Sequence, residues 1–255
     1  EAAGHLVSGF DLASGDDVRD AAALSAAAAG HDAIVHLAGL AGDREERPDE
    51  VMAINLTGTW NVLLAARDAG VKRVVYASSG KALGMLEREP DYLPVDDAHR
   101  GLPSRPYALS KWLSEEMCEA FTRETGIATI CLRPVFVADD GWWARLRFEA
   151  ELPPAPGAAW HLGVIVDVRD VAAAFAAALD CPDPGHARLL LCADEIAADR
   201  PTAELVLEQL PQVPWRDGPP APGSHAALVD CSAAHDVLAW RPRYEWRDRT
   251  RLAPA

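Results

Sequence analysis

Lys72–Gly80 reads KRVVYASSG: two basic residues, then an apolar and β-branched run that ends in serine and glycine. The run does not alternate apolar and polar residues, which is typical of a strand buried on both faces of a parallel sheet. Comparable runs recur at His5–Asp11 (HLVSGFD), His31–Gly39 (HDAIVHLAG), Ile127–Val137 (IATICLRPVFV) and Arg188–Glu195 (RLLLCADE). We therefore expect the core of the fold to be one parallel sheet.

Longer alanine-rich amphipathic stretches separate these runs. They predict helices from about Asp20, over Glu50–Ala69, over Ser104–Thr125 and from Asp170. Strands that alternate with helices indicate a parallel sheet covered on both faces. The predicted class is α/β, with a doubly wound parallel sheet.

The composition excludes several classes of protein. The 255 residues are 49% hydrophobic and 25% charged, as in a globular domain, and no apolar run approaches the roughly 20 residues of a membrane span. A net charge of −15 disfavours binding to nucleic acid. We expect neither nucleic acid nor membrane as a partner.

The five cysteines are widely spaced and form no CxxC pair; they are Cys118, Cys131, Cys181, Cys192 and Cys231. An odd number of separated cysteines in apolar segments is typical of reduced core residues in a cytoplasmic protein. We expect no disulfide and no metal site.

Tyr107 and Lys111 form a YxxxK pair near the start of a predicted helix. Residues i and i+4 share a helix face, and an ammonium beside a phenol favours the phenolate. A tyrosine with a lowered pKa can transfer a proton near neutral pH. The simpler alternative is a solvated surface pair.

Ser79 follows the run VVYAS, at the carboxyl end of a predicted strand. Ligands of open parallel sheets lie outside the carboxyl ends of the strands, so this hydroxyl could bond a substrate oxygen whose proton Tyr107 removes. A serine at a strand end can also be a helix cap or turn former.

With these motifs the chain resembles the extended short-chain dehydrogenase/reductase family, the NAD-dependent epimerase/dehydratase group. The resemblance is carried by Gly15–Asp20, His36–Gly39, Asn55–Asn61, Val74–Ser79 with Gly84, Tyr107–Lys111, Leu132–Pro134, Asp167–Asp170 and Leu238–Pro242. It implies a Rossmann fold and NAD as the cofactor. It also implies a dinucleotide-binding domain over residues 1–134, to which 164–181 return, and a small substrate lobe over 135–163 and 182–255.

The resemblance also implies roles for single residues. Ser79 would orient the substrate, Tyr107 would be the acid/base, and Lys111 would lower the tyrosine pKa and bind the nicotinamide ribose. Asp11 would hold the adenosine ribose, and Asp17 and Val18 would contact adenine. The other implied cofactor contacts are Leu37, Ala38, Gly39, Asn55, Ala77, Ser78 and Pro134. Without the resemblance, Asp11 and Asp17 would be interpreted as turn formers and caps.

The sequence departs from the family pattern in three places. The family's first strand and glycine-rich phosphate loop would lie about 25–30 residues ahead of Asp11, and the printed chain contains neither, so we expect it to begin after them. The loop between Asp11 and Gly15 is also shorter than usual. Gly80 and Lys81 stand where the related 4,6-dehydratases have adjacent acids, which disfavours dehydration.

Six of the eight tryptophans fall after residue 138: Trp142, Trp143, Trp160, Trp215, Trp240 and Trp246. They could wall a ligand pocket, or they could fill the gap between the lobe and the sheet.

Three functions remain open. The first is an NAD-dependent oxidoreductase or epimerase acting on a secondary alcohol of a small sugar-like substrate. The second is a uronate-type dehydrogenase in which Arg145 grips a carboxylate beside Ser79, Gly80, Lys81 and Phe136, although Arg145 could simply pair with Glu149. The third is a non-catalytic NAD-binding regulator.

A homodimer is also expected, by analogy with the family. Two helices carry more apolar residues than one sheet-facing stripe needs, which suggests a four-helix interface. The residues are Met52, Leu56, Leu63, Leu64, Trp112, Met117, Ala120 and Phe121. The alternative is a wide core stripe in a monomer.

Overall fold

The computed structural model describes residues 4–42, 47–85, 87–146 and 162–247. Two compact units can be distinguished. The first comprises Glu1–Ser78, Ser104–Leu132 and Phe175–Arg188, and the second comprises Ser79–Pro103, Arg133–Ala174 and Leu189–Ala255. The division into a cofactor domain and a substrate lobe stays a prediction.

The main sheet has the strand order β1-β2-β3-β6, with β1 at Ala33–His36, β2 at Arg73–Ala77, β3 at Ala128–Pro134 and β6 at His186–Leu191. β2 pairs in parallel with both β1 and β3, in the registers Ile34 with Val74 and Val74 with Thr129. The central strands are buried on both faces, since Val74, Val75 and Ile130 are at most 1% exposed. The predicted α/β fold with a parallel sheet is confirmed.

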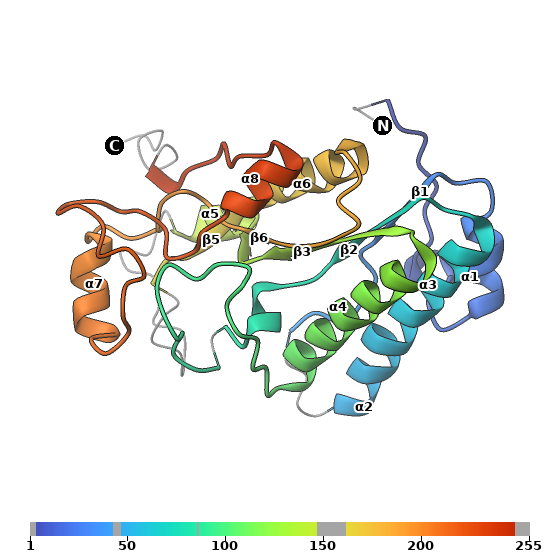
Figure 1. The fold of residues 1–255 in the computed structure, drawn as a ribbon, viewed down its shortest axis with the longest axis horizontal. Helices are drawn as coiled ribbons and strands as arrows, with labels where there is room; N and C mark the ends of the chain where they lie inside the picture. Colours follow the sequence, from blue (N-terminus) through green and yellow to red (C-terminus); the bar gives the residue numbers. More distant parts are fainter. Residues whose placement is uncertain (1–3, 43–46, 86, 147–161, 248–255) are drawn as a thin grey trace. The chain divides into compact units, whose positions relative to one another are not determined.

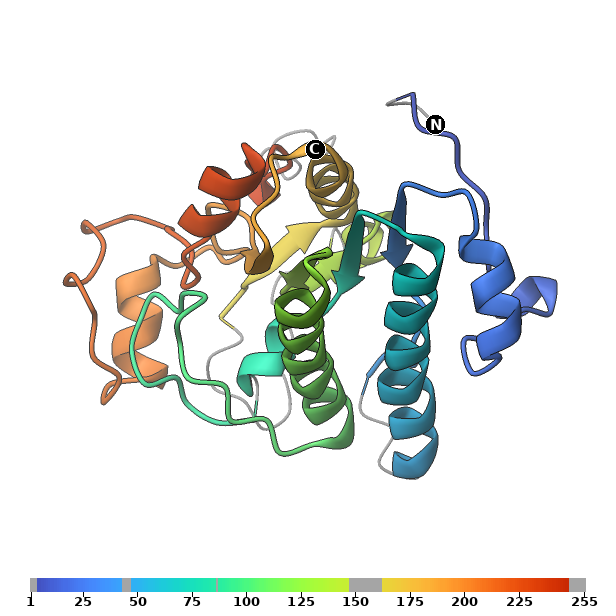
Figure 2. The same ribbon diagram turned by 45° about the vertical axis from the view of Figure 1, so that its right-hand side comes forward.

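The helices of the first unit pack against this sheet. α1 spans Ala21–Ala28 and begins where the Asp20 carboxylate accepts from the amides of Ala22 and Ala23. α2 (Pro48–Val51), a π-helical turn (Met52–Thr57) and α3 (Gly58–Ala69) follow one another without a break, beside α4 (Pro106–Thr125) (Figures 1 and 2). Their inward side chains join Val74 and Tyr76 of β2 in one apolar core.

Two sequence predictions in this unit are wrong. Residues 5–10 form no strand, and Leu6 and Val7 are 98% and 67% exposed. A strand needs a neighbour to pair with, and no described residue pairs with this segment. Leu63 and Phe121, expected at a dimer interface, lie instead in the core of the unit, 0% and 3% exposed.

The second unit contains the parallel pair β4 (Phe136–Ala138) and β5 (Ile165–Asp167) and the helices α5 (Asp140–Leu146), α7 (Thr202–Gln209) and α8 (Ser232–Leu238). α6 (Val168–Asp180) starts here and ends in the first unit. None of the helices among the described residues is long and apolar enough to span a bilayer.

The expected DVRD element, Asp167–Asp170, ties the end of the described chain to this unit. Asp167 is buried and accepts from Trp143 Nε1 at 2.9 Å, while Asp170 accepts from the amides of Arg243 and Tyr244. Trp240 Nε1 donates to the Asp170 carbonyl at 2.9 Å. Trp143 and Trp240 are therefore core residues of the second unit, while Trp160 lies outside the described residues.

All five cysteines are buried and free. Burial raises the pKa of the Cys181, Cys192 and Cys231 thiols, which disfavours the reactive thiolate form.

Candidate active site

The helix α4 carries the YxxxK pair at its first turns. Pro106 occupies the first helical position, where its missing amide hydrogen costs nothing, and Arg105 before it is extended. Tyr107 is half-buried and Lys111 is 5% exposed, which rules out the alternative of a solvated surface pair.

The Lys111 ammonium is held inside the first unit. Its Nζ donates to the carbonyl of Ala77 at 2.7 Å, at the end of β2. The same atom lies 4.8 Å from the centroid of the Tyr76 ring and 5.8 Å from that of Tyr107. Burial lowers the pKa of Lys111 to about 8, against the opposing effect of the Glu115 carboxylate. Below that pH the ammonium is the major form.

Asn55 lies in the π-helical turn and connects two parts of this site. Its Oδ1 accepts from the Leu40 amide at 2.7 Å, and its Nδ2 donates to the Leu40 carbonyl and to Ser110 Oγ, both at 3.1 Å. The loop after β1 is thereby fastened to α4 one residue before Lys111. Such π turns recur at functional sites of helical segments.

Gly39 belongs to this loop and lies close to the ammonium. A Cβ at this position would stand 3.0 Å from Asn55 Oδ1 and 3.7 Å from Lys111 Nζ. Such a contact with Asn55 is tighter than an ordinary van der Waals contact. The absence of a side chain therefore lets this loop approach Asn55 and Lys111 closely.

The sequence interpretation missed two buried polar groups near Lys111. His36 Nε2 lies 2.9 Å from Thr59 Oγ1, whose hydroxyl donates to the Asn55 carbonyl, so His36 is the donor in the first bond. Burial, with a contribution from Lys111, lowers the pKa of His36 to about 3, which keeps the ring neutral. The second group is the Glu115 carboxylate, which accepts from Ser78 Oγ at 2.5 Å. The helical spacing of Tyr107, Lys111 and Glu115 was the available signal for it.

The residues expected at the adenosine end have structural partners of their own. Asp11 caps a short 3-10 turn by accepting from the Ala13 amide at 2.7 Å. Asp17 pairs with Arg19, whose hydrogen bonds lower the pKa of Asp17 to about 2. Val18 packs in the apolar core of the unit. Its side chain lies against Gly58, where a Cβ would stand 2.7 Å from Val18 Cγ2. Of the remaining predicted contacts in this unit, Leu37 is exposed and Ala38 half-buried.

The other predicted site residues belong to the second unit. Ser79 begins a 3-10 turn over Gly80–Leu83 and accepts from the Lys81 amide at 3.2 Å, so its alternative role as a cap is realised. Phe136 is 41% exposed and packs on Trp142 with ring centroids 5.3 Å apart, and Pro134 ends β3. Arg145 lies in α5, but its side chain and Glu149 fall outside the described residues.

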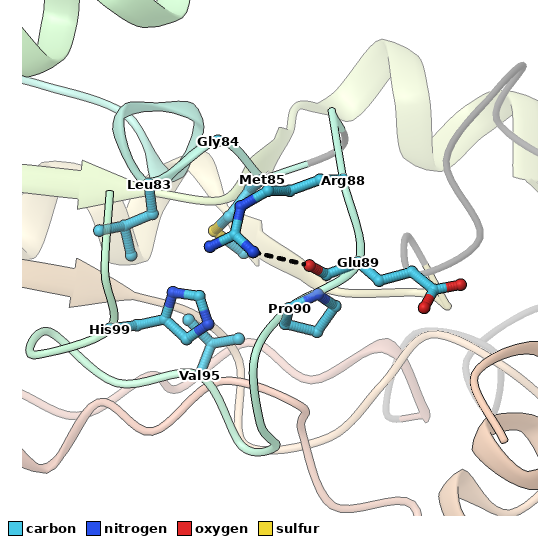
Figure 3. Close-up of a pocket in the computed structure, with 8 residues that line it drawn as sticks. All are labelled: Leu83, Gly84, Met85, Arg88, Glu89, Pro90, Val95 and His99. Carbon is cyan, nitrogen blue, oxygen red and sulfur yellow. Dashed lines mark hydrogen bonds between the residues drawn. The ribbon is translucent and has the colours of Figure 1, made fainter. Parts of the chain in front are cut away.

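A small pocket lies within residues 83–99 of the second unit, lined by Leu83, Gly84, Met85, Arg88, Glu89, Pro90, Val95 and His99 (Figure 3). The Arg88 guanidinium points into it and donates to the Glu89 carbonyl at 3.1 Å. It has room for about one water molecule, which is far less than a small-molecule site needs. We assign it no ligand.

The NAD-dependent epimerase/dehydratase family model matches residues 10–138, half of the chain. The chain belongs to this family. Its match to a putative UDP-glucose 4-epimerase of Methanocaldococcus jannaschii is 42% identical over 31% of this chain and 25% of the relative. Its match to the uronate dehydrogenase of Pseudomonas putida is 34% identical over 46% and 42% of the two chains.

The fold is also that of a short-chain dehydrogenase/reductase superfamily protein from Agrobacterium tumefaciens with bound NAD. The TM-score is 0.69 at 23% sequence identity, and the match covers 92% of the present chain and 82% of the Agrobacterium protein. The chain spans less than half the length of the first curated relatives that it matches.

The donors of Lys111 suit a hydroxyl-rich cofactor such as NAD. Lys111 directs one ammonium hydrogen to the Ala77 carbonyl and has two further donors.

Proposed function

We propose that the protein is an NAD-dependent oxidoreductase or epimerase that acts on a secondary alcohol of a sugar or sugar-derived substrate. The observation that carries the proposal is the buried Lys111 ammonium, fixed on the Ala77 carbonyl and 5.8 Å from the Tyr107 ring centroid. Burying a charge is costly unless the charge is paired and hydrogen-bonded, and perturbed buried groups gather at functional sites.

In this mechanism Tyr107 removes the proton of the substrate hydroxyl, and Ser79 orients that hydroxyl. Lys111 stabilises the phenolate of Tyr107 and donates to the nicotinamide ribose. When bound, NAD would supply the acceptor for the hydride of the carbinol carbon. Asn55 holds the loop at Gly39 close to Lys111. A neutral His36 adds no second positive charge beside Lys111.

A substrate panel tests the proposal and separates its variants. The relatives named as UDP-glucose 4-epimerase and uronate dehydrogenase define the panel: UDP-glucose, galacturonate, glucuronate and the neutral parent sugars. Net formation of NADH indicates a dehydrogenase, and isomerisation without it indicates an epimerase. Tight NAD binding without turnover on any of these would instead favour the non-catalytic regulator.

The uronate variant predicts a role for Arg145. A guanidinium binds a carboxylate through two parallel hydrogen bonds, so Arg145→Ala should reduce kcat/KM for uronates by at least about ten-fold and spare neutral sugars. Initial rates on both classes measure this. Equal effects on acidic and neutral substrates would exclude the carboxylate clamp.

Asp11 predicts a preference for NAD over NADP, because its carboxylate can accept from a ribose 2′-hydroxyl and repels a 2′-phosphate. Asp11→Asn keeps an oxygen to cap the Ala13 amide and removes the charge. We expect it to lower the NAD/NADP affinity ratio by about ten-fold or more, the value of a hydrogen bond to a charged group. Competition titrations measure the ratio, with Asp32→Asn, an exposed site, as the control. A wild-type preference for NADP would contradict the assignment.

We also propose that the protein is a homodimer. Leu63 and Phe121 lie in the core. The interface candidates that remain on the π-helical turn, α3 and α4 are the half-buried Met52, Leu56, Leu64, Trp112 and Met117 and the exposed Ala120. The mass in solution at micromolar concentration tests this proposal.

A further inference from the structure

Glu115 is a fully buried acid that the proposed mechanism does not use. It lies on α4, one turn after Lys111 and two turns after Tyr107, and it is 0% exposed. Glutamate is almost never fully buried unless it is paired. Its position on the face of the helix that carries Tyr107 and Lys111 therefore calls for a physical reason.

The contacts of Glu115 lead back to the segment that Lys111 holds. Ser78 Oγ donates to Glu115 Oε1 at 2.5 Å, and Lys111 Nζ donates to the carbonyl of the preceding residue, Ala77, at 2.7 Å. Hydrogen bonds to charged groups are about twice as strong as neutral ones. Ala77 and Ser78, at the end of β2, are therefore both fastened to α4, one by the Lys111 ammonium and the other by the Glu115 carboxylate.

The electrostatic partners of Glu115 show where its charge acts. On the side of β6, Arg188 is 4.0 Å from Glu115 Oε2, but it makes closer contacts to Glu116 at 3.0 Å and to Glu119 at 2.5 Å. Besides Glu115, the groups that face Lys111 among the described residues are Tyr76 of β2, Tyr107 of α4, Cys131 of β3 and the neutral His36 of β1. Burial lowers the pKa of Lys111, and the negative charge that raises it again comes chiefly from Glu115.

We propose that Glu115 is a positioning residue of the active site, which keeps the Lys111 ammonium charged and, through Ser78, fixes the end of β2 that Lys111 contacts. The inference rests on the proposed function, because Glu115 acts on the chemistry only through Lys111. Without the carboxylate, Lys111 would lose its proton at a lower pH. It could then no longer stabilise a phenolate.

The test is Glu115→Gln, which keeps an acceptor for Ser78 Oγ and removes only the charge. The chain has three lysines, Lys72, Lys81 and Lys111, so the Cε signals of ¹³C-lysine-labelled protein can be assigned from the signal lost in Lys111→Met. In wild type we expect the Lys111 signal to titrate with a pKa of about 8. In Glu115→Gln we expect this pKa to fall by about one pH unit or more, the effect of removing an adjacent opposite charge.

The alkaline limb of the pH profile of kcat/KM should move down by the same amount. The sign follows from the active form: Lys111 acts as the cation, so a lower pKa removes activity at a lower pH. Glu116→Gln is the matched control, because the neighbouring acid pairs with Arg188 on the helix surface. It should leave both the Lys111 pKa and the limb in place.

An unchanged Lys111 pKa in Glu115→Gln, or an equal fall in Glu116→Gln, overturns the proposal. If Glu115→Gln does not fold, Glu115→Asp is the second variant. Its shorter side chain moves the carboxylate away from Lys111, so the Lys111 pKa should lie below the wild-type value. An unchanged Lys111 pKa in Glu115→Asp would overturn the proposed role. The titration needs neither cofactor nor substrate. A shifted Lys111 in a protein without turnover would therefore refute the proposed function alone, and turnover with an unshifted Lys111 would refute this inference alone.

Discussion

Tyr107→Phe is expected to lower kcat by about 10²–10⁴-fold, the usual contribution of a general acid or base. The substitution removes one hydroxyl from the second residue of α4 and leaves the ring in place. The ring keeps its position 5.8 Å from Lys111 Nζ, so the fold and the affinity for NAD should stay nearly unchanged. Steady-state rates, NAD titration and thermal unfolding measure the three quantities.

Tyr244→Phe is the matched control for this prediction. Tyr244 is 38% exposed and its ring lies 3.6 Å from the Arg169 guanidinium carbon, a contact that does not need the hydroxyl. This variant should keep wild-type kcat. Retention of most activity in Tyr107→Phe would show that another group transfers the proton.

Lys111→Met is expected to lower kcat/KM by about 10²-fold or more and to weaken NAD binding by at least about ten-fold. Methionine keeps the volume of the lysine stem, so the variant removes a charge and a hydrogen bond without opening a cavity. Loss of a hydrogen bond to a charged group costs about 1.5–3 kcal/mol, which is ten-fold or more in affinity. Loss of the cation also leaves the phenolate without its neighbouring positive charge.

The same variant is expected to lower the thermal stability. It removes the desolvation penalty of the lysine, but it leaves the Ala77 carbonyl and the buried Glu115 without their cation, and losing one partner of a buried pair is destabilising. Lys72→Met, at a side chain that is 81% exposed, is the control and should change neither rate nor affinity. If Lys111→Met binds NAD like wild type, Lys111 does not contact the cofactor.

Much of the fold could be predicted from local pattern alone. Unbroken apolar runs became β2 and β3, Asp20 starts α1, and Pro106 starts the helix with the YxxxK pair. These features depend on residues close together in the chain. The prediction of a strand at residues 5–10 was wrong, because a strand depends on a neighbouring strand as much as on its own side chains.

The candidate site divides in the same way. The sequence by itself determined that Tyr107 and Lys111 share one face of a helix, because four-residue spacing is a local property of the backbone; the same spacing extends to Glu115, which the sequence interpretation missed. It also determined the α/β class and the family. Only the tertiary structure decided which of these side chains lose contact with water and which atoms they meet.

Lys111 meets the Ala77 carbonyl, Glu115 meets the Ser78 hydroxyl, and Asn55 joins the Leu40 backbone to Ser110. Each of these pairs is between 15 and 55 residues apart in the chain. No periodicity encodes such a pairing, because it arises when strands and helices pack and each buried polar group must find a partner. Burial then set the lowered pKa values of Lys111 and His36, on which the chemistry of the site depends.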